Sequence, residues 1–327
     1  MNYDVFNGDA DGIIALLQLQ LANPTVSVKI TGVKRDIALL QQVVEITNAQ
    51  GNRRDESVIR VLDISMEKNK DALNTLLAEG GNVTYIDHHR AGDIPEHVNL
   101  QTHIDLDANT CTALIVDKIL AGKFHHWAIC AAFGDNLIAK ATKLAKLAGL
   151  NDNECEQLET LGTLINYNGY GSHIDDLHFH PARLYELLLA YSSPFDAIKD
   201  LDSPYYILQK LYNQDHLKAV NTKAFYDTAL LTAFELPDET WARRISGVFG
   251  NELANINPKK AHAIFTINTD NTYTVSLRAP LANKQGAGDI CSQFATGGGR
   301  AAAAGINALA KDKIEAFLAA VAAYYSE

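Results

Sequence analysis

Residues 83–90 of the chain read Val-Thr-Tyr-Ile-Asp-His-His-Arg, an apolar run followed directly by a carboxylate and two imidazoles. The apolar part predicts a buried strand over 83–86, with Asp87 and His88 at its end. In an open α/β sheet, ligand-binding groups gather at the ends of the strands. Adjacent side chains of an extended segment point to opposite sides, so one imidazole can bind a metal while its neighbour faces elsewhere.

The first half of the chain alternates short apolar runs with helical patterns, which is typical of βαβ units and a parallel sheet. The predicted strands are 3–6, 26–31, 57–62, 83–86 and 98–104. The predicted helices are 12–22, 36–47, 67–79 and 111–121, followed by a mostly helical stretch over 125–165. Asn109 and Thr110 are candidate caps of the fourth helix, and Gly122 is placed to end it.

A change of pattern near residue 166 predicts a different organisation for the second half. Aromatic-rich helical segments broken by prolines extend over 166–240, and a second α/β pattern starts near Ile245. This second α/β pattern contains a predicted hairpin, with strands over 262–267 and 273–278, and a C-terminal helix over 311–325. We therefore predict an α/β chain of three parts: a parallel-sheet domain over 1–190, a helical connector over 191–243 and a smaller α/β domain over 244–327.

Composition limits the partners of this chain. Its 327 residues, 47% of them hydrophobic, suffice for two domains. The net charge of -11 and a pI near 5.4 argue against a broad surface for duplex nucleic acid. The four scattered cysteines and the lack of any signal-peptide or membrane-spanning pattern predict a cytoplasmic protein without a membrane partner. The oligomeric state stays open, with a homodimer among the options.

Acidic residues stand at the ends of other predicted elements as well. Residues 7–12 read Asn-Gly-Asp-Ala-Asp-Gly, so Asp9 and Asp11 are spaced to face one pocket. Asp63 ends the third strand, and Asp135 follows an apolar helix. Carboxylates and imidazoles together suit Mn-type ions. Two such ions, about 3.5 to 4 Å apart, would clamp the attacking and leaving oxygens of a phosphoryl displacement.

Each of these features has an ordinary structural explanation when it is taken by itself. The Asp-x-Asp-Gly sequence is a common turn. Asp63 resembles a helix cap, because Ser65 and Glu67 follow it, and Asp135 could equally cap a helix or lie on the surface. Their placement at the ends of elements in one sheet favours a shared metal site.

Four of these stretches, in order, resemble the motifs of the DHH phosphoesterase family: Asn7 to Gly12, Leu62-Asp63, Asp87-His88-His89 and Gly134-Asp135-Asn136. That family includes RecJ-type exonucleases, nano-RNases, cyclic-dinucleotide phosphodiesterases, exopolyphosphatases and family II pyrophosphatases. Residues 297–305, Gly-Gly-Gly-Arg-Ala-Ala-Ala-Ala-Gly, resemble the glycine-rich motif of the DHH-associated C-terminal domain. The resemblance implies a DHH domain over 1–190 and a substrate-binding domain over 244–327.

The resemblance also implies a two-metal centre. One Mn²⁺ would be held by Asp9 and Asp63, and the other by Asp11, Asp63, His88 and Asp135; Mg²⁺ or Co²⁺ are possible replacements. A bridging water, its pKa lowered by both cations, would attack phosphorus in line.

The same resemblance assigns Asp87 to orient a histidine and His89 to approach the substrate phosphate. Asn7 stands where the family commonly has a histidine ligand of the first metal, and a neutral amide oxygen binds more weakly.

In the C-terminal motif, Gly297, Gly298 and Gly299 would let the backbone approach a phosphate. Arg300 replaces the usual histidine and would keep a cationic phosphate contact. Arg278 matches a strand-end position that the family uses for substrate.

The expected function is a Mn-dependent phosphodiesterase, resembling 3′–5′ exonucleases, that acts on short single-stranded oligonucleotides or dinucleotides. Low overall basicity favours a short substrate. The alternatives are an inorganic pyrophosphatase or exopolyphosphatase, and a catalytically weakened nucleotide-binding sensor.

Overall fold

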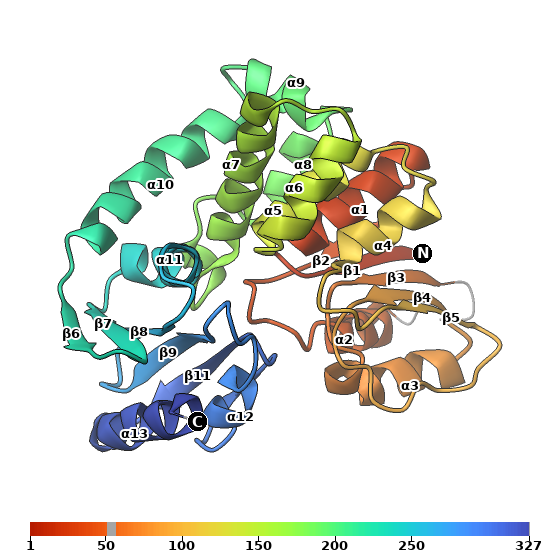
Figure 1. Ribbon diagram of the computed structural model, residues 1–327. Helices are drawn as coiled ribbons and strands as arrows, with labels where there is room; N and C mark the ends of the chain where they lie inside the picture. Colours follow the sequence, from red (N-terminus) through yellow and green to blue (C-terminus); the bar gives the residue numbers. More distant parts are fainter. Residues whose placement is uncertain (51–56, 327) are drawn as a thin grey trace. The chain divides into compact units, whose positions relative to one another are not determined.

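The computed structural model describes residues 1–50 and 57–326, which fall into two compact units, Met1–Lys210 and Leu211–Glu327. In the first unit, five parallel strands form a sheet in the order β2-β1-β3-β4-β5 (Figure 1). The strands are β1 (Asn2–Phe6), β2 (Val28–Ile30), β3 (Val58–Leu62), β4 (Asn82–Asp87) and β5 (Leu100–Ile104). The predicted α/β class and parallel sheet are confirmed.

Helices cover both faces of this sheet (Figure 1). Tyr3 and Val5 of β1 point to the face where α2 and α3 pack, and the other face carries α1, α4, α5 and α8. The helices of the unit are α1 (Ala10–Ala22), α2 (Leu40–Gln50), α3 (Lys70–Ala78), α4 (Thr112–Ile119), α5 (His125–Gly134), α6 (Ile138–Leu147), α7 (Asp152–Gly169), α8 (Pro181–Leu188) and α9 (Pro194–Lys199).

The start of α4 differs from its prediction. Asn109 and Thr110 do not cap this helix, because it begins at Thr112 with Cys111 in the cap position and no side-chain bond from that residue. The carboxylate of Asp11, 101 residues earlier in the chain, accepts the free N–H groups instead. A long-range carboxylate has therefore replaced the local cap that the sequence favours.

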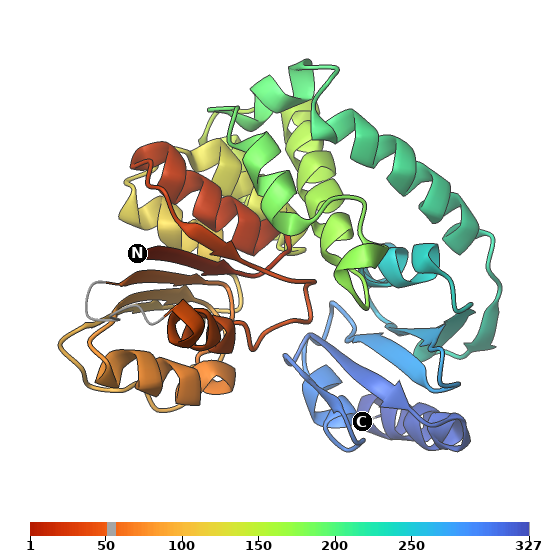
Figure 2. The ribbon, with the colours of Figure 1, turned by 180° about the vertical axis from the view of Figure 1, so that it is seen from behind.

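The second unit contains a mixed sheet in the order β10-β11-β9-β8-β7-β6, in which β7 and β8 are parallel and the other pairs antiparallel. Its strands are β6 (Ala224–Asp227), β7 (Leu231–Leu236), β8 (Ala261–Ile267), β9 (Tyr273–Arg278), β10 (Gly297–Gly299) and β11 (Ala303–Leu309). Its helices are α11 (Thr240–Ile256), α12 (Ala287–Cys291) and α13 (Ile314–Tyr325). Figure 2 shows α11 on one face of the sheet and α12 and α13 on the other.

The predicted hairpin over 262–267 and 273–278 is confirmed as the antiparallel pair β8 and β9. Asn271 in its turn has φ 61°, a left-handed conformation that asparagine tolerates well.

The prediction that helices fill 166–240 is wrong beyond Val220. Helix α10 (Pro204–Val220) is followed by β6 and β7, so the segment 191–243 holds two strands of the second sheet as well as helices. Pro181, Pro194 and Pro204, which suggested breaks, are each the first residue of a helix, where proline loses no hydrogen bond. Among the described residues, no helix combines the length and apolar character needed to cross a membrane.

Candidate metal centre

The order of the strands places the predicted acidic residues at one point of the first sheet. Strand β1 has β2 on one side and β3 on the other, so the connections leave β1 and β3 in opposite directions. In open α/β sheets such a switch point is where ligands bind. Asp9 and Asp11 follow β1, Asp63 follows β3, and Asp87 ends β4. These side chains are almost completely buried, between 0 and 3% exposed.

Asp9 is the N-cap of α1 and forms an ion pair with Lys34. Its Oδ1 accepts hydrogen bonds from the backbone N–H groups of Asp11 and Gly12, both at 3.1 Å. Its Oδ2 lies 2.5 Å from the Nζ of Lys34. Burial alone would raise the pKa of Asp9, but the ammonium group outweighs burial and holds this pKa below its usual value.

Asp11 joins the switch point to the N-terminus of α4. The backbone N–H groups of Thr112 and Ala113 donate to its two oxygens, each at 2.7 Å. A helix N-terminus stabilises a carboxylate through its free N–H groups and its dipole. Each oxygen still has a lone pair for a further ligand.

Asp63 occupies a left-handed backbone conformation, with φ 60°, directly after β3. Aspartate is one of the few residues other than glycine that tolerate this region. Its Oδ1 accepts a hydrogen bond from the hydroxyl of Thr112 at 3.1 Å. Burial, followed by the nearby carboxylates of Asp11 and Asp9, raises the pKa of Asp63 well above its usual value.

His88 faces three carboxylates with one ring nitrogen. Its Nδ1 is 3.0 Å from the carbonyl oxygen of Thr110, so Nδ1 carries the proton and donates it to that carbonyl. In the neutral ring this leaves the lone pair on Nε2. Nε2 lies 3.6 Å from Asp11 Oδ2, 3.4 Å from Asp63 Oδ1 and 4.0 Å from Asp135 Oδ2.

These separations fit ligands that surround one divalent cation. Metal–ligand bonds of roughly 2.1 Å place neighbouring donor atoms about 3 Å apart and opposite ones about 4 Å apart. The donors are a neutral imidazole, oriented by a backbone carbonyl, and carboxylate oxygens, a set that suits Mn²⁺. Asp63, His88 and His89 form an alternative ligand group, with ligand atoms within 4.8 Å of one another.

His89 lies at the edge of the same centre, where its Nδ1 is 3.8 Å from Asp63 Oδ1, and bonds to Asp87. Its Nδ1 lies 2.7 Å from Asp87 Oδ1, and its side chain is 26% exposed whereas that of Asp87 is fully buried. The two adjacent histidines thus bond to different partners, the Thr110 carbonyl and Asp87, although both lie near Asp63 Oδ1.

Asn7 lies beside the Asp9 half of the site. Its Nδ2 donates to the backbone carbonyl of Lys34 at 3.1 Å. Its Oδ1 is buried and has no hydrogen-bond partner among the described residues. A buried acceptor without a protein partner is rare in folded proteins and is commonly satisfied by an ordered water or an ion.

Sequence reasoning missed Lys34, Thr112 and Asn166. Lys34 Nζ contacts Asp9 Oδ2, Asn166 Oδ1 at 3.0 Å and Asp135 Oδ1 at 3.9 Å. Lys34 follows β2 by four residues, so it leaves the same edge of the sheet as the aspartates. The position of Lys34 shortly after a predicted strand could therefore have identified it from the sequence. No comparable feature of the sequence points to Asn166, which lies within helix α7.

In the second unit, the predicted substrate-binding residues differ in accessibility. Arg278 is 8% exposed and donates to Asn251 Oδ1 at 2.5 Å, to Ser276 Oγ at 2.9 Å and to the Gly247 carbonyl at 3.1 Å. These bonds tie its guanidinium group to α11 and to its own strand β9, so a substrate contact by Arg278 stays a prediction.

The glycine-rich edge is more open. Gly297, Gly298 and Gly299 form the edge strand β10, and Arg300 after it is exposed. Gly299 has φ 142° and no room for a Cβ, which would come within 2.5 Å of Ala304 Cα. A Cβ on Gly298, by contrast, would meet open space. The edge thus has no room for a side chain at Gly299 or at Gly297, where a Cβ would come within 1.8 Å of the Cys291 carbonyl oxygen, and leaves open space at Gly298 between them.

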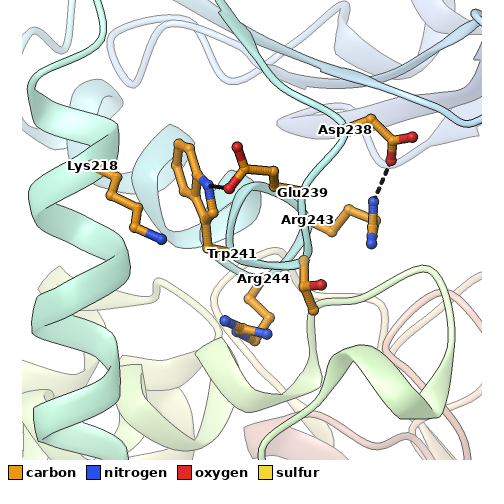
Figure 3. Close-up of a pocket in the computed structure, with 7 residues that line it drawn as sticks. Lys218, Asp238, Glu239, Trp241, Arg243 and Arg244 are labelled. Atoms are coloured by element: carbon orange, nitrogen blue, oxygen red, sulfur yellow. Dashed lines mark hydrogen bonds and ion pairs between the residues drawn. The ribbon is translucent and has the colours of Figure 1, made fainter.

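A separate pocket of about 380 Å³ lies around the start of α11 (Figure 3). Its cationic side chains already have partners, since Arg243 pairs with Asp238 at 2.6 Å and Arg244 with Asp215 at 2.9 Å. Lys218 lies 5.2 Å from the ring centre of Trp241. None of the residues predicted from the sequence lines this pocket, and we assign no ligand to it.

Comparison with known proteins adds one family match and several similar structures. Residues 221–327 match the model of the DHHA1 domain. A search of curated protein sequences finds no match. The exonuclease RecJ bound to manganese is similar with a TM-score of 0.59 and 16% identity, covering 100% of this chain and 90% of that one.

Two further structures are similar at low identity. RecJ in complex with Mn²⁺ from Thermus thermophilus has a TM-score of 0.59 at 16% identity, covering 99% of this chain and 52% of that one. The pGpG-specific phosphodiesterase PggH from Vibrio cholerae has a TM-score of 0.55 at 13% identity, covering 100% of this chain and 99% of that one. Likeness at such identities establishes the fold.

Proposed function

We propose that this chain is a member of the DHH phosphoesterase family and a metal-dependent phosphodiesterase acting on short single-stranded oligonucleotides or dinucleotides, supported by its DHHA1 domain and its fold. One observation carries the proposal. The Nε2 of His88 faces the carboxylates of Asp11, Asp63 and Asp135, which come from three other parts of the chain. A buried set of acids has little structural value and is costly to keep, so a cation-dependent function is its best explanation.

The residues divide into holding and positioning roles. Asp11, Asp63, His88 and Asp135 would hold a divalent cation, with Mn²⁺ as the preferred ion and Mg²⁺ or Co²⁺ as alternatives. Such a cation supplies a water activated at neutral pH and neutralises charge on the phosphate.

The N-terminus of α4 fixes Asp11, and the carbonyl of Thr110 fixes the ring of His88. His89 would donate to a phosphate oxygen, because it is the more exposed imidazole and Asp87 sets its orientation.

A short substrate is supported by charge and by the relatives. The net charge of -11 does not suit a long polyanion, whose binding requires many cationic contacts. RecJ is an exonuclease and PggH is a phosphodiesterase specific for pGpG. Arg300, which is exposed and follows the open position Gly298 in the chain, would contact a substrate phosphate. The DHHA1 domain also counts against an inorganic pyrophosphatase, since such a substrate has no base for the domain to accept.

The test is hydrolysis by the purified full chain, with Mn²⁺, Mg²⁺, Co²⁺ or EDTA. The substrates are pGpG, a single-stranded oligonucleotide of about ten nucleotides and inorganic pyrophosphate, and the products are separated by chromatography. We expect mononucleotides from the dinucleotide with Mn²⁺ and none with EDTA. Release of phosphate from pyrophosphate alone would assign the pyrophosphatase function. Nucleotide binding without turnover of any substrate would assign the sensor function.

A further inference from the structure

We propose that the ammonium group of Lys34 permanently takes the place of one of the two divalent cations, so that this chain binds a single divalent ion per active site. The inference rests on the proposed function and concerns the Asp9 half of the same site. There the DHH resemblance implies a metal held by Asp9 and Asp63, and the structure places a lysine against Asp9.

Lys34 is held in the site by contacts to both its side chain and its backbone. Nζ has three N–H groups, and oxygens of Asp9 and Asn166 lie 2.5 and 3.0 Å away, with Asp135 Oδ1 at 3.9 Å. The ring centre of Tyr170 is 5.4 Å from Nζ on a further side. The backbone N–H of Lys34 donates to the Gly169 carbonyl at 2.8 Å. A side chain fixed by this many bonds is part of the site's construction.

Both oxygens of Asp9 are engaged in this arrangement. Oδ1 caps α1, and Oδ2 bonds to Lys34. A divalent ion at Oδ2 would have to displace the ammonium group or lie within a few ångström of it, in a buried region where like charges repel strongly.

The contact between Asn7 and the backbone of Lys34 also supports a lysine in place of the first metal. The family commonly has a metal-binding histidine at this position, whereas Asn7 uses its amide nitrogen to hold the carbonyl of Lys34. An imidazole ligand has thus been replaced by a neutral amide that helps to anchor a lysine. In the opposite half of the site, the carboxylates of Asp11, Asp63 and Asp135 lie 3.4 to 4.0 Å from His88 Nε2.

The experiment counts manganese ions and does not depend on activity. Wild type and variants are loaded with Mn²⁺, and bound metal is measured by mass spectrometry and titration calorimetry, with electron paramagnetic resonance to detect a spin-coupled pair. We expect one ion in the wild type and in Lys34→Arg, which keeps the charge. Lys34→Met should bind two ions and show the spectrum of a coupled pair, and Asn7→His added to it should tighten the second ion.

The chain offers a closely matched control in Lys29. This lysine also pairs with a buried carboxylate, Asp4 at 3.4 Å, and also lies over a tyrosine ring, that of Tyr185 at 5.5 Å. Lys29→Met should therefore keep one ion. Thermal melting of each variant checks that it is folded.

Two tightly bound ions in the wild type would overturn the inference while leaving the proposed function intact. One ion in Lys34→Met and in its Asn7→His double variant, with both folded, would also overturn it, because Lys34 would then not be what excludes the second ion. Hydrolysis is assayed separately. A wild type that binds one ion and hydrolyses none of the substrates would refute the proposed function alone.

Discussion

The bond between Asp87 and His89 provides the sharpest test of the positioning roles in this site. The substitution Asp87→Asn keeps the size of the side chain and removes its charge. The bond is 2.7 Å long and Asp87 is fully buried, so the imidazole donates to a carboxylate that is shielded from water. We expect a lower kcat/KM for dinucleotide hydrolysis and an unchanged affinity for Mn²⁺, because Asp87 holds His89 and does not bind metal in this proposal.

The magnitude follows from the strength of the bond that changes. A hydrogen bond to a charged group contributes about 1.5 to 3 kcal/mol, and a neutral one about 0.5 to 1.5 kcal/mol. The amide oxygen introduced by Asp87→Asn would retain the neutral bond, so the loss is about 1 to 2 kcal/mol, or roughly 5- to 30-fold in kcat/KM.

A second aspartate–histidine pair in the same unit serves as the control. His125 Nδ1 lies 2.7 Å from Asp117 Oδ2, and in both pairs the other carboxylate oxygen has no hydrogen-bond partner among the described residues. Asp117→Asn should therefore change stability about as much as Asp87→Asn and change kcat/KM less than about twofold. Equal losses of activity in both variants, or loss of Mn²⁺ binding in Asp87→Asn, would refute the positioning role.

Three further outcomes are expected. Asp63→Ala should abolish hydrolysis and weaken Mn²⁺ binding by roughly tenfold or more, since Asp63 lies 3.4 Å from His88 Nε2; normal turnover in this variant would exclude Asp63 as a ligand. Asp4→Ala should lower the free energy of unfolding by about 3 to 5 kcal/mol in urea titration, because the buried carboxylate pairs with Arg60 at 2.6 Å; a loss below about 1 kcal/mol would contradict this. Arg300→Ala should raise KM for the dinucleotide severalfold with kcat nearly unchanged, and an unaltered KM would argue against a phosphate contact there.

The first sheet could be predicted because each of its strands carries a local signal. A buried parallel strand is an apolar run, and the residue that follows it lies at the carboxyl edge of the sheet whatever the rest of the chain does. Asp63 and Asp87 therefore had positions that the sequence alone could assign. The strands β6 and β7 were missed because aromatic and leucine-rich segments fit a helix or a strand equally well, and their pairing depends on the distant strand β8.

The contacts that complete the site could not be predicted, because they join residues far apart in the sequence. Asp11 meets the N-terminus of α4 across 101 residues, and Lys34 meets Asn166 across 132. The hydrophobic pattern of a sequence predicts helices and strands, but it does not predict which loop residue will contact which carboxylate. The motifs thus identify where cations are needed, while the tertiary fold determines whether a cation comes from solution or from the chain. Asn7 illustrates the difference: in the sequence it is only a weaker ligand, and in the structure its amide holds the lysine that neutralises Asp9.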